Sequence, residues 1–285
     1  MFDRIAIGAT ALMAALGLSI AAAPAFDDSK YPNLKGQWTR TSVPGEASPP
    51  PFDPSKPPGR GQQAPLTPEY QKIFEANLRE LDAGVPGTWP GPTCIPPGMP
   101  GLMTAYAPLQ IVVLPNTTYI RTDYIRDTRR RIWTDGRGWP QHAEPTYDGY
   151  AIGKWIDADG DGVFDLLEVE TRHFKGPRAF DLSGIPLHED NETVIKERIF
   201  LDKADKNLLH DEMTVIDHAL TRPWTVTKNY RRNADSKAEW EEYTCVERTA
   251  TIKLGGETYL LKDGFLAPAK KGQKPPSLQY FPTQN

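Results

Sequence analysis

The sequence lacks several of the patterns by which enzyme and nucleic-acid-binding classes are recognised. It has no G-x-S-x-G nucleophile elbow, no P-loop and no dinucleotide-binding glycine fingerprint. Its five histidines show neither H-x-x-x-H nor H-E-x-x-H spacing, so no metal-ligand pair of these kinds is indicated. The formal net charge is only −4, with both signs interspersed, and this gives no electrostatic footprint for nucleic acid.

Long apolar runs are also missing, with one exception at the N-terminus. Arg4 precedes an apolar run over residues 5–22, and Ala-Pro-Ala at 23–25 has the small-x-small form of a cleavage site. We therefore expect residues 1–25 to be a signal peptide and the mature protein to be periplasmic or secreted. A retained membrane anchor is the alternative. No later segment is long and apolar enough to span a bilayer, so no span is expected after cleavage.

Cysteine is scarce, since only Cys94 and Cys245 are present. Export would place both in an oxidising compartment, which favours a disulfide between them. Closing so long a loop would restrict the unfolded chain by about 4–5 kcal/mol in the chain-entropy model. A catalytic thiol is the alternative, but neither cysteine has a histidine partner in its local sequence.

Short β-type segments separated by turns make up most of the mature chain. Gly36-x-Trp38 opens the first of them in the manner of lipocalin-like barrels, and further strands are expected at 109–114, 117–126, 129–134, 193–201, 207–217, 223–232 and 241–246. Turns every 8–12 residues predict an antiparallel sandwich or barrel. One amphipathic helix is expected over 67–81, capped by Thr67 and ended by Gly84. The expected fold is mainly β: an antiparallel lipocalin-like β-barrel or curved sheet with one external amphipathic helix.

The same features divide the chain into four parts. After the signal peptide, residues 26–66 hold the first strand and a proline-rich arm, 67–264 form the β-barrel domain with its helix, and 265–285 form a loose C-terminal tail. A rigid loop over 93–103 is expected to place Met99 and Met103 against apolar neighbours, as core filler or at a barrel mouth.

The segment 155–172 contains an acidic loop with the ligand pattern of a calcium site. The ligand positions 1, 3, 5, 7, 9 and 12 are taken by Asp157, Asp159, Asp161, Val163 through its carbonyl, Asp165 and Glu168. Gly162 supplies the sharp turn at position 6. The flanking residues have strand rather than helix character, which predicts a β-hairpin whose turn binds a structural calcium ion. A solvated Asp-Gly hairpin turn is the alternative.

Strand alternation over 193–201 places Glu197 on the same face as Ile195, Ile199 and Leu201. If that face points into the barrel, Glu197 is a buried carboxylate and a candidate general acid/base or polar anchor. The alternative is a structural ion pair with Arg121, Arg172 or Arg222. His188 lies in the loop that enters this strand and is the candidate catalytic partner of Glu197, unless it is simply a polar surface residue.

Several segments resemble a family of exported bacterial proteins without an established activity. They are Thr67-Pro-Glu-Tyr, Cys94-Ile-Pro-Pro-Gly-Met-Pro, Arg131-Ile-Trp-Thr-Asp-Gly-Arg, Tyr150-Ala-Ile-Gly-Lys-Trp, Pro186-Leu-His, Lys196-Glu-Arg, Leu220-Thr-Arg-Pro-Trp and Tyr243-Thr-Cys. The resemblance implies export and a lipocalin-like barrel, and it implies no reaction. The chain departs from the family at the acidic loop, where many relatives have a plain hairpin, and at Tyr150, where many have histidine.

Three functions are compatible with these features. The first is a barrel that binds a small apolar molecule through candidate residues Met99, Met103, Tyr150, Arg222 and Trp224. The second is a cofactor-independent lyase, isomerase or hydrolase that uses His188 and Glu197 as its acid–base pair. The third is a structural envelope protein stabilised by calcium and the disulfide. The sequence identifies no specific ligand and no oligomeric state.

Overall fold

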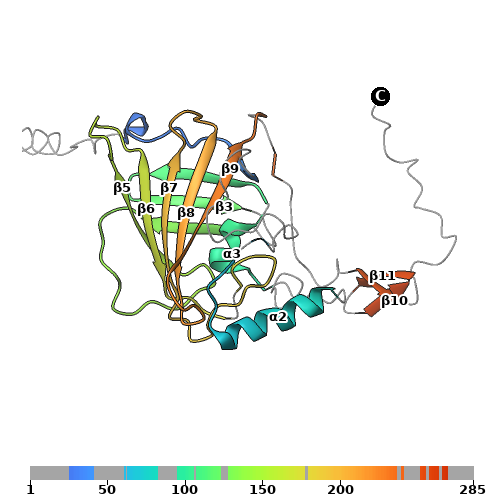
Figure 1. Cartoon of the computed structure of the whole chain (residues 1–285). Helices are drawn as coiled ribbons and strands as arrows, with labels where there is room; N and C mark the ends of the chain where they lie inside the picture. The colour runs from blue at the N-terminus through green and yellow to red at the C-terminus, as the bar shows by residue number, and fades with distance from the viewer. Residues whose placement is uncertain are drawn as a thin grey trace, which may run out of the picture.

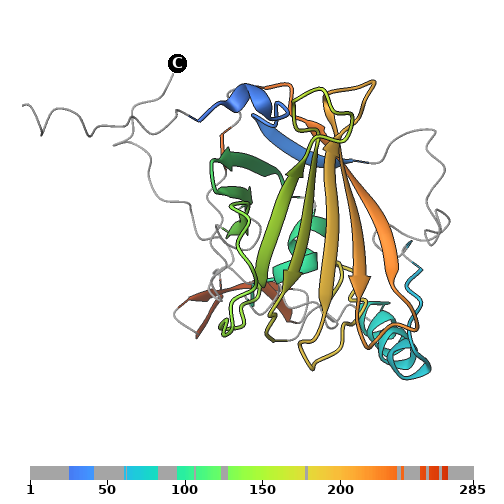
Figure 2. The same cartoon turned by 90° about the vertical axis from the view of Figure 1, so that its left-hand side faces the viewer.

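The computed structural model describes residues 26–41, 61, 63–82, 95–105, 107–122, 128–176, 179–235 and 239–240, together with the backbone of 251–254, 257–262 and 265–268. Within these residues, nine strands close into a single barrel in chain order. Figures 1 and 2 show the barrel from two sides, with its long strands running between a top end and a bottom end. The expected mainly β barrel is confirmed.

The barrel strands keep to sequence order around the whole ring. They are β1 (Gln37–Thr41), β2 (Leu109–Leu114), β3 (Thr117–Thr122), β4 (Thr128–Trp133), β5 (Tyr150–Ile156), β6 (Leu166–Arg172), β7 (Val194–Leu201), β8 (Leu208–Ile216) and β9 (Trp224–Arg232). Every neighbouring pair is antiparallel except β4 and β5, which run parallel and pair only through Ile132 with Ala151 and Trp133 with Ile152. The ring closes where β1 pairs with β9.

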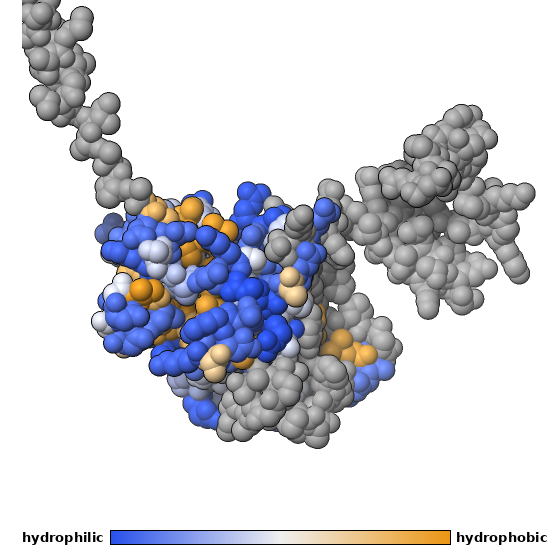
Figure 3. All heavy atoms as spheres, turned by 90° about the horizontal axis from the view of Figure 1, so that it is seen from above, coloured by the Kyte–Doolittle hydropathy of each residue, from blue (hydrophilic) through white to orange (hydrophobic). Residues whose placement is uncertain are grey.

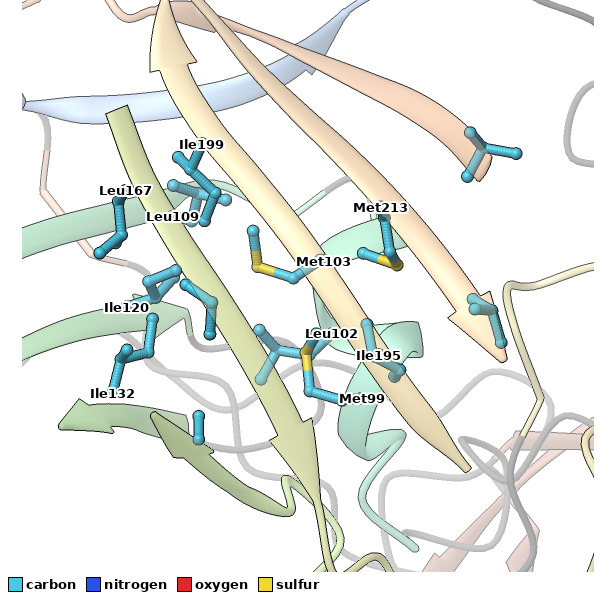
Figure 4. Packing of buried hydrophobic residues seen from close by; sticks show 14 of the residues in the cluster. Met99, Leu102, Met103, Leu109, Ile120, Ile132, Leu167, Ile195, Ile199 and Met213 are labelled. Atoms are coloured by element: carbon cyan, nitrogen blue, oxygen red, sulfur yellow. The ribbon is translucent and has the colours of Figure 1, made fainter. Parts of the chain in front are cut away.

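Alternation along the strands places one set of side chains inside the barrel. In β7, the buried residues Ile195, Glu197, Ile199 and Leu201 alternate with more exposed neighbours, as the period of a half-buried strand requires. Figure 4 shows buried aliphatic and methionine side chains from several strands meeting in the interior. Burying these apolar side chains supplies the main driving force for folding.

Helix α2 (Pro68–Asp82) lies outside the barrel at its bottom end (Figure 1), close to the expected bounds. The Thr67 hydroxyl accepts a weak hydrogen bond from the Tyr70 amide at 3.4 Å, as expected for a capping residue. The only fully buried residue of the helix is Asn77, whose side-chain amide donates to the Ser183 carbonyl at 2.7 Å. Ile73 of the same helix is exposed.

A second helix, α3 (Gly98–Thr104), stands where the sequence predicted a rigid loop. All seven of its residues are buried, and Met99, Leu102 and Met103 lie among the strands in Figure 4. Gly98 has φ +59°, and a Cβ there would lie 2.1 Å from the Tyr147 carbonyl oxygen, so only glycine fits. The loop prediction was wrong because packing inside the barrel overrides the low helix propensity of a Gly- and Pro-rich segment.

The boundaries of the barrel differ from the expected ones. β1 is part of the ring, which therefore begins at residue 37 and not with the helix region. Residues 251–268 contain β10 (Thr251–Leu254), β11 (Glu257–Lys262) and β12 (Phe265–Pro268), which form their own three-stranded sheet. The predicted strand at 241–246 lies outside the described residues. No helix among the described residues has the length and apolar character needed to cross a membrane.

Candidate functional site

A charged cluster lies among the apolar side chains of the barrel interior. Arg130 of β4 donates from Nη1 to Glu197 Oε1 at 2.8 Å and from Nη2 to Glu197 Oε2. The same Nη2 donates to the Thr171 hydroxyl at 3.0 Å. The side chains of Arg130 and Glu197 are 1% and 0% exposed, so this is a fully buried ion pair that links β4 to β7 across the interior.

Asp211 of β8 and Lys228 of β9 form the second part of the cluster. They are register partners on adjacent strands, and both are buried. Neither carboxylate oxygen of Asp211 has a hydrogen-bond partner within the structure. A buried polar atom without a partner costs free energy, which makes it a candidate contact for a ligand or substrate.

Burial sets the ionisation of this pair. It raises the pKa of Asp211 well above its ordinary value, and the negative charge of Glu197 raises it further, while Arg130 and Lys228 act in the opposite direction. Burial also lowers the pKa of Lys228 to about 8, helped by the positive charge of Arg40 and opposed by Asp181 and Asp211. Two neighbouring groups are thus brought toward neutral pH from opposite sides.

The surroundings of Lys228 combine a carboxylate with an aromatic ring. Phe180 presents its ring 5.2 Å from Lys228 Nζ, a cation–π distance. Asp181 is buried and accepts hydrogen bonds from the amide of Ser183 at 3.0 Å and from its hydroxyl at 2.5 Å. Burial raises the pKa of Asp181. The hydroxyl of buried Tyr230, also on β9, donates to the Met103 carbonyl and so fastens α3 to the barrel wall.

Arg130 Nε and Trp224 Nε1 are also buried donors without a hydrogen-bond partner. Trp224 is fully buried and packs its ring 4.5 Å from that of Phe180. The interior therefore combines unused donors and acceptors with mainly aliphatic and aromatic side chains, which is the usual composition of a small-molecule site. Met99, Met103 and Met213 are the most adaptable of these apolar side chains (Figure 4).

The acidic loop connects β5 to β6 at the top end, the face seen in Figure 3. Ligand oxygens of Asp157, Asp159 and Asp161 lie within 4.8 Å of one another. Asp157 accepts the amides of Gly160 at 2.7 Å and Gly162 at 2.9 Å, which folds the loop around its carboxylate. Gly162 has φ +88°, consistent with the sharp turn expected there. An all-oxygen donor set is the chemistry that calcium prefers.

The remaining predicted calcium ligands are placed differently. Asp165 adjoins the loop and accepts the Ala158 amide at 3.2 Å, and the Val163 amide donates to Asp161 at 2.8 Å. Glu168 lies on β6 opposite Lys154, three positions before the loop begins on β5. The hairpin thus brings together the three aspartates 157, 159 and 161 and leaves Glu168 on the outer face of the barrel.

Aromatic packing ties the acidic loop to the first described segment of the chain. The Phe164 amide donates to the Lys30 carbonyl at 2.8 Å. Tyr31 packs its ring 5.1 Å from Phe164 and 5.4 Å from Trp155. Figure 3 shows this end as mainly hydrophilic with apolar atoms between the loops. Ordering of the loop is therefore coupled to packing at the top of the barrel.

The five predicted ligand-binding residues divide into two groups. Met99, Met103 and Trp224 are buried in the interior. Tyr150 faces outward on β5 and packs beside Trp139, with ring centroids 6.1 Å apart. Arg222 is exposed in the connection between β8 and β9. Only the first group can contact a molecule held inside the barrel.

The predicted acid–base pair of His188 and Glu197 is not formed. Glu197 faces inward as expected, but its carboxylate is occupied by Arg130, a partner that was not among the three arginines considered. His188 lies in the connection between β6 and β7, where its Nδ1 accepts the Asp190 amide at 3.1 Å. The observed geometry of Glu197 therefore matches the alternative interpretation, a structural ion pair with an arginine.

Asp211, Lys228 and Arg130 were missed although the sequence carries a signal for two of them. Asp211 shares its alternation with Leu209, Met213 and Val215, and Lys228 shares its alternation with Trp224, Val226 and Tyr230. Applying the rule used for Glu197 to these strands would have placed both residues inside. Arg130 lies in a run of three arginines, where alternation alone does not show which side chains point inward.

The predicted disulfide partners, Cys94 and Cys245, both lie outside the described residues.

Comparison of the sequence with protein-family models finds no match, and comparison with curated proteins finds none either. The function is therefore inferred from the barrel and from the charged cluster inside it.

Proposed function

We propose that this protein is an exported β-barrel that binds a small, mainly apolar molecule bearing one polar group. The apolar part would contact the methionine and aromatic lining, including Met103 and Trp224. The polar group would be held by Asp211, with Lys228 beside it. A calcium ion at the acidic loop would have a structural role, because a single loop between strands has no helix pair to open as a sensor does.

The observation that carries this proposal is the state of Asp211. A fully buried carboxyl group without a hydrogen-bond partner destabilises the folded protein. A ligand donor that reached Asp211 would remove this cost on binding and would give the site its polarity. In the Arg130–Glu197 pair, by contrast, both carboxylate oxygens of Glu197 already accept hydrogen bonds from Arg130. This pair would have a structural role and would not contact the ligand.

The test is native mass spectrometry of the protein purified gently from the periplasm, compared with its Asp211→Asn variant. We expect the wild type to carry an added mass of a few hundred daltons, and the variant to lose it and to melt at a higher temperature than ligand-free wild type. Glu212→Gln is the matched control, because Glu212 lies next in sequence but pairs outside the barrel with Arg198 at 2.8 Å. Equal retention by both variants, or a bare wild type that no small-molecule panel stabilises, would favour the structural role.

A second candidate function is favoured by the pKa values of the same pair. A carboxyl group with a raised pKa beside an amine with a pKa of about 8 can exchange protons near neutral pH. Asp211 and Lys228 would then replace His188 and Glu197 as the acid–base pair of a cofactor-independent lyase or isomerase. Chemically different molecules bound to the wild type and to Lys228→Met would support turnover, whereas identical molecules would support binding alone.

A further inference from the structure

A second group of possible ligand atoms lies at the bottom end of the barrel. It is formed by His188 and Asp190 from the β6–β7 connection and His218 from the β8–β9 connection. Their ligand atoms all lie within 4.8 Å of one another. Because 28 residues separate Asp190 from His218, no motif in the sequence indicates this grouping.

The distances place both imidazole rings around one carboxylate oxygen. Asp190 Oδ2 lies 2.5 Å from His218 Nδ1 and 3.1 Å from His188 Nδ1. Tetrahedral ligands about 2.1 Å from zinc would be roughly 3.4 Å apart, so a modest opening of the group would accept an ion. His218 can make that movement, because its side chain is 69% exposed.

His188 Nδ1 has two close polar neighbours in Asp190. It accepts the Asp190 amide at 3.1 Å and lies 3.1 Å from Asp190 Oδ2. The ring nitrogen and the carboxylate oxygen therefore converge on one place at the surface, where a cation could contact both. An ion bound there would replace the contact between the amide and Nδ1, and water could take over the Asp190 amide in its exposed turn.

Neighbouring contacts hold the two connections in this arrangement. Asp217 Oδ1 accepts the His188 amide at 2.9 Å and the Ala219 amide at 2.8 Å, so one carboxylate fastens both connections. The Glu192 amide donates to Asp190 Oδ1 at 3.0 Å and leaves Oδ2 directed at the histidines. The Tyr70 ring of α2 packs 5.4 Å from His188. Contacts of this kind, made to the ligand residues by their neighbours, orient ligands in metal sites.

We propose that His188, Asp190 and His218 bind one divalent transition-metal ion, of which zinc is the best suited. Two imidazole nitrogens and a carboxylate select zinc, cobalt or nickel over calcium, which prefers oxygen ligands. The exposed position leaves the remaining coordination to water. This site is independent of the acidic loop at the other end of the barrel and of the proposed interior ligand.

The test is titration of the full mature chain with Co²⁺ and Zn²⁺, in the presence of calcium so that the acidic loop does not compete. We expect one equivalent of Co²⁺ with visible d–d absorption, displaced by Zn²⁺. His218→Ala should weaken binding at least tenfold and Asp190→Asn should weaken it similarly. His142→Ala is the control, since His142 is an exposed histidine in another loop and should bind as the wild type does.

The outcomes separate a metal site from a hydrogen-bonded turn. No Co²⁺ spectrum, or equal loss of binding in His142→Ala and His218→Ala, would overturn the proposal. His218 is largely exposed, so a loss of fold does not account for its effect, and circular dichroism checks this directly. A result at this site leaves the test at Asp211 unaffected, because that test measures a bound organic molecule.

Discussion

Burial changes the pKa of charged residues in the barrel interior, and Lys228 shows this most directly. Because burial lowers its pKa from 10.5 to about 8, the unfolded chain holds a proton between pH 8 and 10.5 that the folded chain has released. The free energy of unfolding should therefore rise with pH across this window, by up to about 1.4 kcal/mol per pH unit from this group.

Lys228→Met removes that contribution. Urea unfolding at pH 8, 9 and 10 should show the wild type gaining stability relative to the variant as the pH rises. Substituting the exposed Lys154 by Met is the control and should leave the pH dependence unchanged. Parallel curves for the wild type and Lys228→Met would contradict the assigned burial of the amine.

The Arg130–Glu197 pair makes a different prediction at the same scale. Glu197→Gln leaves the guanidinium of Arg130 buried without its counter-charge and should cost about 3–5 kcal/mol of stability. The double variant Arg130→Met, Glu197→Met removes both charges and should cost less than Glu197→Gln alone. The double-mutant cycle uses the single variants Arg130→Met and Glu197→Met, measured by urea unfolding, and would reject a coupled pair if these two single changes simply added.

Alternation predicts the direction of a side chain but not its partner. It correctly placed Glu197 inside, because one face of that strand is otherwise aliphatic. Its partner Arg130 could not be chosen, since 67 residues separate the two and the strand register that joins them is not visible in sequence. For the same reason, the approach of His218 to Asp190 could not be foreseen.

Among the elements, α3 is the clearest case of tertiary structure overriding local preference. Its entry depends on Gly98, where a Cβ would meet the Tyr147 carbonyl oxygen. Gly98→Ala should therefore destabilise the protein by more than the roughly 1–2 kcal/mol of a left-handed alanine. Gly136→Ala is the matched control, because Gly136 has φ +78° with no atom near its missing Cβ.

Thermal unfolding of the two alanine variants separates the cost of backbone strain at a positive φ from the cost of the steric clash with Tyr147. Both carry the cost of a positive φ, and only Gly98→Ala adds the contact with Tyr147. Equal melting temperatures would show that α3 tolerates a shift at its first residue. The barrel strands, by contrast, were predicted within a few residues, because alternation and turn residues mark them locally, whereas β10, β11 and β12 were not predicted.

Calcium binding by the acidic loop can be tested through its effect on thermal stability. If the loop binds calcium, the melting temperature should rise with the ion, and Asp157→Ala should abolish the rise. Glu168→Gln distinguishes two geometries, because Glu168 would be a ligand in a helix-flanked loop but lies opposite Lys154 in the hairpin. We expect Glu168→Gln to keep its response to calcium, measured by differential scanning calorimetry.

For the whole molecule, the expected signal peptide makes a prediction about processing. Cleavage after Ala25 should leave Phe26 as the new N-terminus, and this is the first residue of the segment that packs against the acidic loop through Tyr31. Ala25→Leu should block cleavage, because the residue before the cut must be small. Intact mass of the exported protein checks this, with Ala22→Leu as the control that is still processed.

The seam between β1 and β9 joins Thr41 to Asn229 and Trp38 to Arg232, nearly the full span of the barrel sequence. Such distant pairings give the ring a high contact order, which slows folding because a long loop must close before any contact compensates. The ring also cannot be completed during synthesis until β9 has left the ribosome. We therefore expect closure of the ring to be a late event in folding, and until it occurs the edges of β1 and β9 are open to other chains.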